Sequence, residues 1–292
     1  MRRSYKASER VAASPSRLEP LLQILQVRDN RPMDTFTLHR GTAPLLVSLP
    51  HDGSAIPEDL AVRMTPEARR APDTDWHVSR LYAFARDLGA SVLVPRYSRY
   101  VVDLNRPEDD TSLYPGQNTT GLCPTVRFTG EPLYLEGQSP AADEIIGRID
   151  TYWRPYHDAL RAELDRLHGL HGRVVLWEGH SIRGSDLPFL FDGRLPDLNL
   201  GTAAGTSCTP ALQARLEGVL AAQGTYDWVA NGRFKGGHIT RHYGQPSRAV
   251  NAVQLEISQR TYMDEDSFEY DEDKAADLQI VLRDLLAAAI SL

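Results

Sequence analysis

The sequence predicts a single α/β domain with a mainly parallel or mixed central sheet flanked by helices. Apolar runs of strand length alternate with segments of helical periodicity along most of the 292 residues. Neither an internal repeat nor a convincing linker divides the chain. A helix between successive strands is typical of parallel pairing, because the chain must cross back to the same end of the sheet.

The first half of the chain supplies two or three of the predicted strands. Residues 44–51 (PLLVSLPH) form an apolar run that is typical of a strand buried on both faces. Residues 78–90 have helical spacing of apolar side chains and carry Gly89 where a C-terminal cap is expected. Residues 91–106 are predicted to form one or two strands. Residues 108–140 are rich in Gly, Pro, Asn and Thr, which predicts a long irregular segment.

The second half continues the alternation. Helices are predicted over residues 141–172, with an interruption or kink at Pro155, and over residues 209–224 and 273–292. Strands are predicted over residues 173–181 and 251–262. In the last strand, Gln254 and Glu256 alternate with apolar residues and therefore face the opposite side.

Composition restricts the function classes. The net charge of −7 argues against a nucleic-acid partner or an anionic membrane surface. No apolar run approaches the ~18 residues of a membrane span. The two cysteines fit a reducing compartment, so a cytoplasmic location is expected. The protein is expected to be a monomer or a small homo-oligomer. Residues 1–33 lack the apolar core of a signal peptide and are expected to form a mobile leader before a domain at 34–292.

Polar side chains follow three of the apolar runs: His51, residues 103–106 and residues 178–180. The carboxyl ends of strands form the ligand crevice of open α/β sheets, so these groups could converge. His51 and His180, with Asp75, would provide the ligands of a hydrolytic zinc site with one position left for water. Because the chain has nine histidines, a structural role is the alternative for each of them. Three on or just after the long helix, including His157, are expected at the surface.

Several motifs carry a resemblance to a known enzyme family. Among them are LVSLPHDGSAIP, DTDWHVSRLYAFARDLGA, YSRYVVDLNRPEDD, WEGHSIRG, NGRFKGGHITRHYGQP and VQLEISQRTYM. Over about residues 40–285 the sequence resembles N-formylglutamate deformylases, amidohydrolases that end one branch of histidine degradation by releasing formate and glutamate. The resemblance implies a zinc-carboxypeptidase-like α/β fold with a divalent metal at the strand ends, and the expected metal is Zn²⁺.

The resemblance also implies roles at the metal and for the reacting groups. His51 and His180 match the metal-binding histidines, and Asp75 matches the carboxylate ligand, with Asp73 as a second candidate. Glu256 corresponds to the general base. Arg183 is expected to stabilise the oxyanion.

The substrate implied by the resemblance has two carboxylates. Asn105 and Arg106 resemble the carboxylate-binding pair of carboxypeptidases. The second carboxylate is expected to contact residues of the segment 233–241. The candidates there are Arg233, Lys235, His238 and Arg241, and the Gly236–Gly237 pair argues against a helix at His238.

Two other functions remain open at this point. One is a related metal-dependent deacylase that acts on another N-acyl amino acid, which needs a wider pocket for its acyl group. The other is a non-catalytic protein that binds an acidic metabolite.

Overall fold

The computed structural model describes residues 1, 34–113, 116, 118–185 and 187–291. Apart from Met1, the predicted leader at residues 1–33 lies outside the described residues. The described chain forms a seven-stranded sheet in the order β1-β3-β2-β4-β7-β5-β6. The strands are β1 (Phe36–His39), β2 (Leu45–Ser48), β3 (Ser91–Pro95), β4 (Val174–Ile182), β5 (Leu198–Gly201), β6 (Trp228–Ala230) and β7 (Val250–Ser258).

The sheet is mixed and has a parallel centre. Strands β3, β2, β4 and β7 pair in parallel, so their carboxyl ends lie along one edge. Strand β1 runs antiparallel to β3, and β5 runs antiparallel to β7 and parallel to β6. The predicted α/β class with a mainly parallel or mixed sheet is confirmed.

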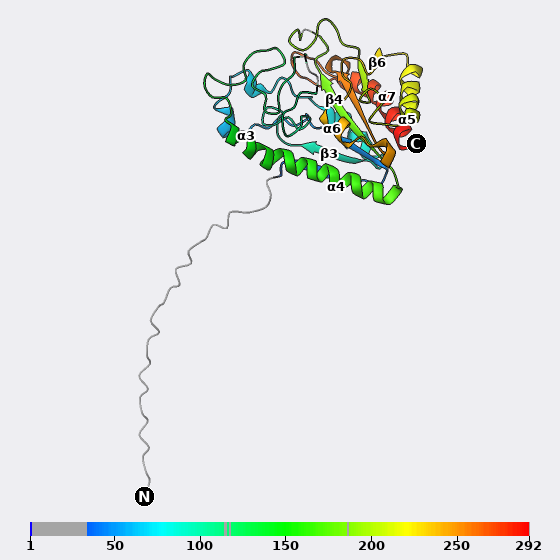
Figure 1. Cartoon of the computed structure of the whole chain (residues 1–292), viewed down its shortest axis with the longest axis horizontal. Helices are drawn as coiled ribbons and strands as arrows, with labels where there is room; N and C mark the ends of the chain where they lie inside the picture. The colour runs from blue at the N-terminus through cyan, green and yellow to red at the C-terminus, as the bar shows by residue number, and fades with distance from the viewer. Residues whose placement is uncertain (2–33, 114–115, 117, 186, 292) are drawn as a thin grey trace. The chain divides into compact units, whose positions relative to one another are not determined.

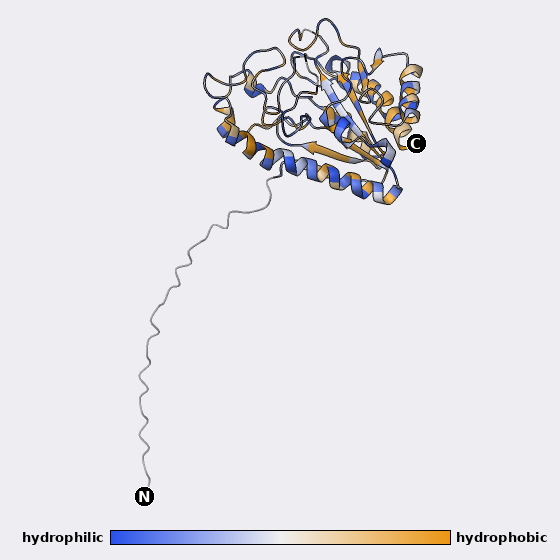
Figure 2. Ribbon diagram, in the orientation of Figure 1, coloured by the Kyte–Doolittle hydropathy of each residue, from blue (hydrophilic) through white to orange (hydrophobic). Residues whose placement is uncertain are grey.

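Helices cover both faces of the sheet. Figure 1 shows α4 (Arg154–His171) along one side and α5 (Pro210–Ala222) with α7 (Glu272–Ile290) on the other. Alternate residues of one strand therefore enter different cores: Leu45 packs with the α5 and α7 side, whereas Leu46 packs with the α4 side. Figure 2 shows apolar strands between helices of mixed polarity. Of the helices described, none is long and apolar enough to cross a bilayer.

Shorter helical elements complete the described part of the chain. The α-helices are α1 (Glu58–Ala61), α2 (Val78–Leu81), α3 (Ala142–Arg148) and α6 (His238–Tyr243). Single 3-10 turns are Ala68–Arg70, Ala83–Arg86, Pro246–Arg248 and Gln259–Thr261. The helix predicted at 78–90 is thus two short pieces that meet at Tyr82, and Gly89 follows with φ +76°. The long irregular segment predicted at 108–140 contains no helix or strand among its described residues.

The long helix predicted at 141–172 is continuous but irregular. A π-helical turn, Ile149–Trp153, joins α3 to α4 one turn before Pro155. Proline has no N–H to donate to the carbonyl one turn earlier, so the preceding turn can widen without losing a further hydrogen bond.

Two expectations about elements near the site are wrong. Residues 100–102 do not form a strand, because Val101 N donates to Ser98 O at 2.9 Å in a turn. Tyr100 and Val101 are buried because they pack in an apolar cluster outside the sheet. A helix does begin at His238, because the backbone N–H groups of Ile239 and Thr240 are bound by side chains from other elements. The Gly pair only precedes this helix.

The prediction that His157 lies at the surface is also wrong, because its side chain is buried. Its Nε2–H donates to Leu104 O at 2.9 Å, and its Nδ1 accepts from the Tyr243 hydroxyl at 2.9 Å. The ring therefore joins α4 to the loop of residues 103–106 and to α6.

Candidate active site

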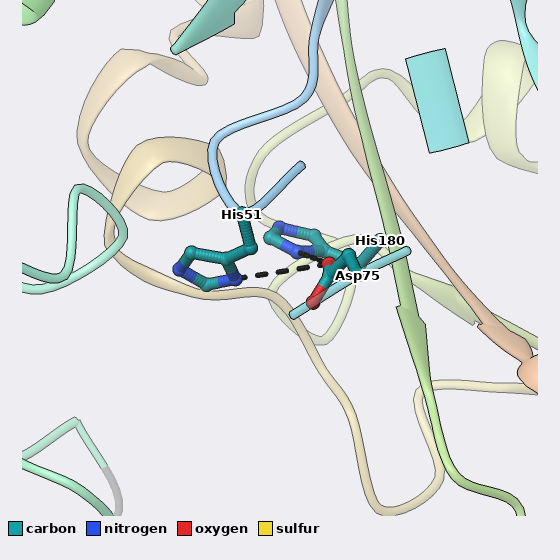
Figure 3. Close-up of side chains that lie close together, drawn as sticks. All are labelled: His51, Asp75 and His180. Carbon is teal, nitrogen blue, oxygen red and sulfur yellow. Dashed lines mark hydrogen bonds and ion pairs between the residues drawn. The ribbon is translucent and has the colours of Figure 1, made fainter. Parts of the chain in front are cut away.

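Three ligand-type side chains meet at the carboxyl edge of the sheet. His51 follows β2, His180 lies near the end of β4, and Asp75 precedes α2. Their ligand atoms all lie within 4.8 Å of one another. In Figure 3 dashed lines join the Asp75 carboxylate to both rings, at 3.8 Å from His51 Nδ1 and 2.9 Å from His180 Nδ1. The structure thus brings together the three predicted metal ligands.

The other nitrogen of each ring is held by a carboxylate. His51 Nε2–H donates to Asp103 Oδ1 at 2.6 Å, and His180 Nε2–H donates to Glu178 Oε1 at 2.7 Å. In this arrangement the Nδ1 atom of each ring faces Asp75, and the supporting carboxylates resemble those behind metal-binding histidines. The donor set N, N, O with these supporting carboxylates fits a divalent metal such as Zn²⁺.

Backbone contacts hold Asp75 in place. Its N–H donates to His51 O at 3.1 Å, and Ser181 N donates to its Oδ2 at 3.0 Å. Asp73, the second candidate, instead accepts from Phe128 N at 2.8 Å and lies outside the group of ligand atoms.

The charges around these ligands are mainly negative. Burial opposes a charge on His180, but Glu178 and Asp75 together raise its pKa well above the ordinary value. The Arg99 guanidinium counters part of this negative charge: it donates to His51 Nδ1 at 3.2 Å and to Asp103 Oδ2 at 2.6 Å. Acidic groups held this close together favour the binding of a cation.

Glu256 lies beside His180 because of the sheet register. The two residues are paired on the parallel strands β7 and β4, so their side chains share a face. Burial raises the pKa of Glu256 to about 8. Within the described residues its carboxyl group makes no hydrogen bond, so it is directed into the site without a protein partner. The predicted alternation of this strand is confirmed, since Val253 and Leu255 pack in the core.

One cavity, here called the main cavity, is lined by the three ligand-type residues together with Arg99 and Glu256. Its lining residues are His51, Asp75, Arg99, Asn105, Arg106, Asn118, Thr119, Thr120, Phe128, His180, Ser181, Ile182, Leu190, Arg233, Phe234, Gly237, Gln254 and Glu256. Three predicted substrate-binding residues, Asn105, Arg106 and Arg233, are therefore placed at the cavity.

These three residues are held by neighbouring groups. Asn105 Oδ1 accepts from Ile239 N at 2.9 Å, which fixes the orientation of its amide group. Arg106 Nε donates to Thr120 O at 2.8 Å, and Arg233 donates to Leu190 O. Two guanidinium groups thus reach the cavity from different loops.

Four other predicted site residues lie elsewhere. Lys235 and Arg241 are exposed, and Arg241 Nε donates to Gly236 O at 2.8 Å. The His238 ring lies 5.7 Å from that of His157, outside the lining of the main cavity. Arg183 forms an ion pair with Asp266 at 2.9 Å and lines a neighbouring cavity.

Sequence reasoning missed Arg99, Thr120 and Gln254 among the residues of the main cavity. Arg99 lies in the motif SRYVVDLNRP that was singled out, so its proximity to Asp103 and Asn105 was an available signal. The hydroxyl of Thr120 is buried without a hydrogen-bond partner in the described structure. Thr120 belongs to the motif TTGLCP (119–124), which is shared with the family, but no residue of this motif was assigned a role from the sequence.

Comparison with known proteins agrees with this geometry. The family model for N-formylglutamate amidohydrolase matches residues 43–263. An N-formylglutamate deformylase of Pseudomonas putida is 54% identical over 256 residues, which cover 87% of this chain and 95% of that protein. One from Pseudomonas aeruginosa is 53% identical over 259 residues, covering 88% and 97%.

Solved structures give the same result. The crystal structure of N-formylglutamate amidohydrolase from Ralstonia eutropha JMP134 has a TM-score of 0.76 at 28% identity and covers 89% of this chain and 97% of that chain. A gene product from Agrobacterium tumefaciens, at 17% identity and a TM-score of 0.65, shares the fold. The chain belongs to the N-formylglutamate amidohydrolase family.

Proposed function

We propose that this protein is a metal-dependent amidohydrolase that hydrolyses N-formyl-L-glutamate to formate and L-glutamate. The observation that carries the proposal is one cavity lined by Glu256, by the group His51, Asp75 and His180, and by three arginines, Arg99, Arg106 and Arg233. The names of the similar Pseudomonas proteins supply the substrate. The reaction would end one branch of histidine degradation in the cytoplasm.

His51, Asp75 and His180 would hold the metal, for which Zn²⁺ is the first choice because of the N, N, O donor set. When bound, such an ion polarises the formyl carbonyl and lowers the pKa of a coordinated water. Asp103 and Glu178 keep the two imidazole rings in the ligating tautomer.

Glu256 acts as the general base and then as the general acid. Its carboxylate takes a proton from the attacking water and delivers it to the nitrogen of the breaking C–N bond. A buried carboxyl group without a hydrogen-bond partner among the described residues suits this role, because no protein contact has to be broken first.

Arg99 is better placed than Arg183 to stabilise the oxyanion. It lines the main cavity, and its guanidinium reaches His51 at 3.2 Å, whereas Arg183 is paired with Asp266. A fixed cation beside the reacting carbonyl stabilises the negative charge of the tetrahedral transition state.

Arg106 and Arg233 bind the two carboxylates of the glutamate portion. Guanidinium groups form strong paired hydrogen bonds with carboxylates, and both lie at the cavity. Replacing either arginine by lysine keeps the charge and removes the paired geometry, so KM should rise more than kcat falls.

The test measures formate release from N-formyl-L-glutamate before and after chelation and after Zn²⁺ is restored. We expect release that the chelator abolishes and the metal restores. Release that survives complete metal removal would contradict the metal-dependent mechanism. Release from a longer N-acyl amino acid but not from the formyl compound would assign the chain to the deacylase alternative.

A further inference from the structure

A second cavity lies next to the main cavity. The residues that line it include Arg127, Arg183 and Leu187. Phe128, Ser181 and Ile182 line both cavities. These shared residues are here called the partition between the two cavities. Its two large apolar members, Phe128 and Ile182, are 8% and 5% exposed and belong to the same small apolar cluster.

The partition stands at the metal-ligand end of the main cavity. Ile182 follows His180 by two residues in β4 and therefore shares its face of the strand. The Arg99 guanidinium lies over the Phe128 ring, 4.7 Å from its centroid. The other apolar lining residues, Leu190 and Phe234, pack against the same apolar cluster. Phe234 follows Arg233 in the chain, and Arg233 donates to Leu190 O.

The substituent on the reacting carbonyl must enter one of these apolar regions. In an N-acyl amino acid the carbonyl carbon carries an oxygen, the amide nitrogen and the acyl substituent. The oxygen belongs with the metal ligands and Arg99, and the nitrogen leads to the carboxylates at Arg106 and Arg233. We take the remaining direction, away from Arg106 and Arg233, to lead to Phe128 and Ile182, because Phe128 lies beside Arg99 and Ile182 shares the strand face of His180.

We propose that Phe128 and Ile182 set the acyl-group specificity of this enzyme by closing the acyl end of the main cavity against all but the hydrogen of a formyl group. This inference rests on the proposed function and extends it to the acyl group. Shortening either side chain would join the two cavities and create room for acetyl or propionyl groups.

The experiment compares kcat/KM for N-formyl-, N-acetyl- and N-propionyl-L-glutamate in the zinc-loaded protein. For Ile182→Ala and Phe128→Ala the acetyl-to-formyl ratio should rise at least about tenfold, since one carbon in an apolar pocket changes specificity about 10- to 200-fold. Ile182→Val and Phe128→Leu should show smaller rises, and they keep the test valid if the alanine variants do not fold.

Two control variants match the chemistry of the substitutions. The controls are Leu187→Ala and Leu190→Ala. Leu187 belongs to the same apolar cluster but lines only the second cavity, and Leu190 lines only the main cavity. Neither should change the acetyl-to-formyl ratio by more than about twofold, because neither opens the partition.

The outcomes separate this inference from the proposed function. If the wild type releases formate and none of the four partition variants changes the ratio, the partition does not select the acyl group. If Leu187→Ala or Leu190→Ala raises the ratio as much as Ile182→Ala does, a general loosening explains the change and the inference is wrong. If the wild type prefers acetyl or propionyl, both the proposed function and a closed partition are wrong.

Discussion

At the scale of single residues, Glu256 differs from the other buried carboxylates of the site. Asp75, Asp103 and Glu178 each accept hydrogen bonds, whereas the Glu256 carboxyl makes none among the described residues. The register of β4 and β7 places it beside His180, and burial raises its pKa to about 8. These properties suit a group that exchanges a proton and does not bind the metal.

Replacing Glu256 by Gln should lower kcat by about 10²- to 10⁴-fold and leave the bound metal unchanged, because the amide keeps the shape but cannot accept the proton. Activity and metal content would be measured on the same preparation. Asp75→Asn is the matched control and should lose metal. Loss of metal from the Glu256→Gln protein would identify Glu256 as a ligand instead.

His157 gives a pH-dependent contribution to stability. Burial lowers its pKa from 6.5 to about 3, so the folded state holds it neutral while the unfolded state takes up a proton below pH 6.5. Its contribution is therefore complete above pH 6.5 and is lost as the pH falls. Between pH 7 and pH 5 the loss should be about 2 kcal/mol.

Urea unfolding of the wild type and of His157→Gln at both pH values measures this effect. The difference in unfolding free energy between the two proteins should shrink by about 2 kcal/mol from pH 7 to pH 5. A difference that stays constant with pH would show that His157 does not titrate in this range.

At the scale of elements, β4 and α4 each place some side chains in a core and the others in a different environment. In β4, Val175 and Trp177 pack in one core, whereas Glu178 and His180 lie at the site. The long helix α4 buries one side against the sheet and exposes the other. Its apolar stripe therefore contributes to stability, although its residues do not reach the reacting groups.

Leu160 and Leu170 of α4 test this division on one helix. Leu160 is fully buried, and Leu170 is 62% exposed. Leu160→Ala should lower the free energy of unfolding by about 2–5 kcal/mol, as is typical for a truncated core leucine. Leu170→Ala should change it by less than about 0.5 kcal/mol. Equal effects in a denaturant titration would contradict the packing of this helix.

At the scale of the whole molecule, the site connects segments that are far apart in the chain. His51, Asp75 and His180 come from three separate elements, and a bound metal would hold them together only in the folded state. Metal binding and folding are therefore linked. Metal-free protein should be less stable than loaded protein.

Free Zn²⁺ at 100 times its Kd should stabilise the fold by about 2.7 kcal/mol and raise the Tm accordingly. His51→Ala should abolish this metal-dependent increase, whereas the exposed His39→Ala should keep it. Thermal unfolding with and without added metal measures both. An unchanged increase in His51→Ala would place the metal elsewhere.

Much of the fold followed from local patterns. The buried strands around His51, His180 and Glu256 were predicted because apolar runs of strand length hold more β-branched and aliphatic residues than loops do. The segment at 100–102 has the same composition but forms a turn. The strand was predicted there from apolar composition alone. One apolar triplet occurs both in strands and in packed loops, so it cannot distinguish between them.

The sequence by itself determined the fold class, the family and the candidate metal ligands, since these depend on residue type and order along the chain. Only the tertiary structure decided which charged side chains share a space. Arg99 reaches the main cavity while Arg183, Lys235 and Arg241 do not, and Asp75 joins the two histidines while Asp73 turns to Phe128. The physical reason is that a side chain's direction depends on how its loop packs against distant strands, which neighbouring residues do not specify.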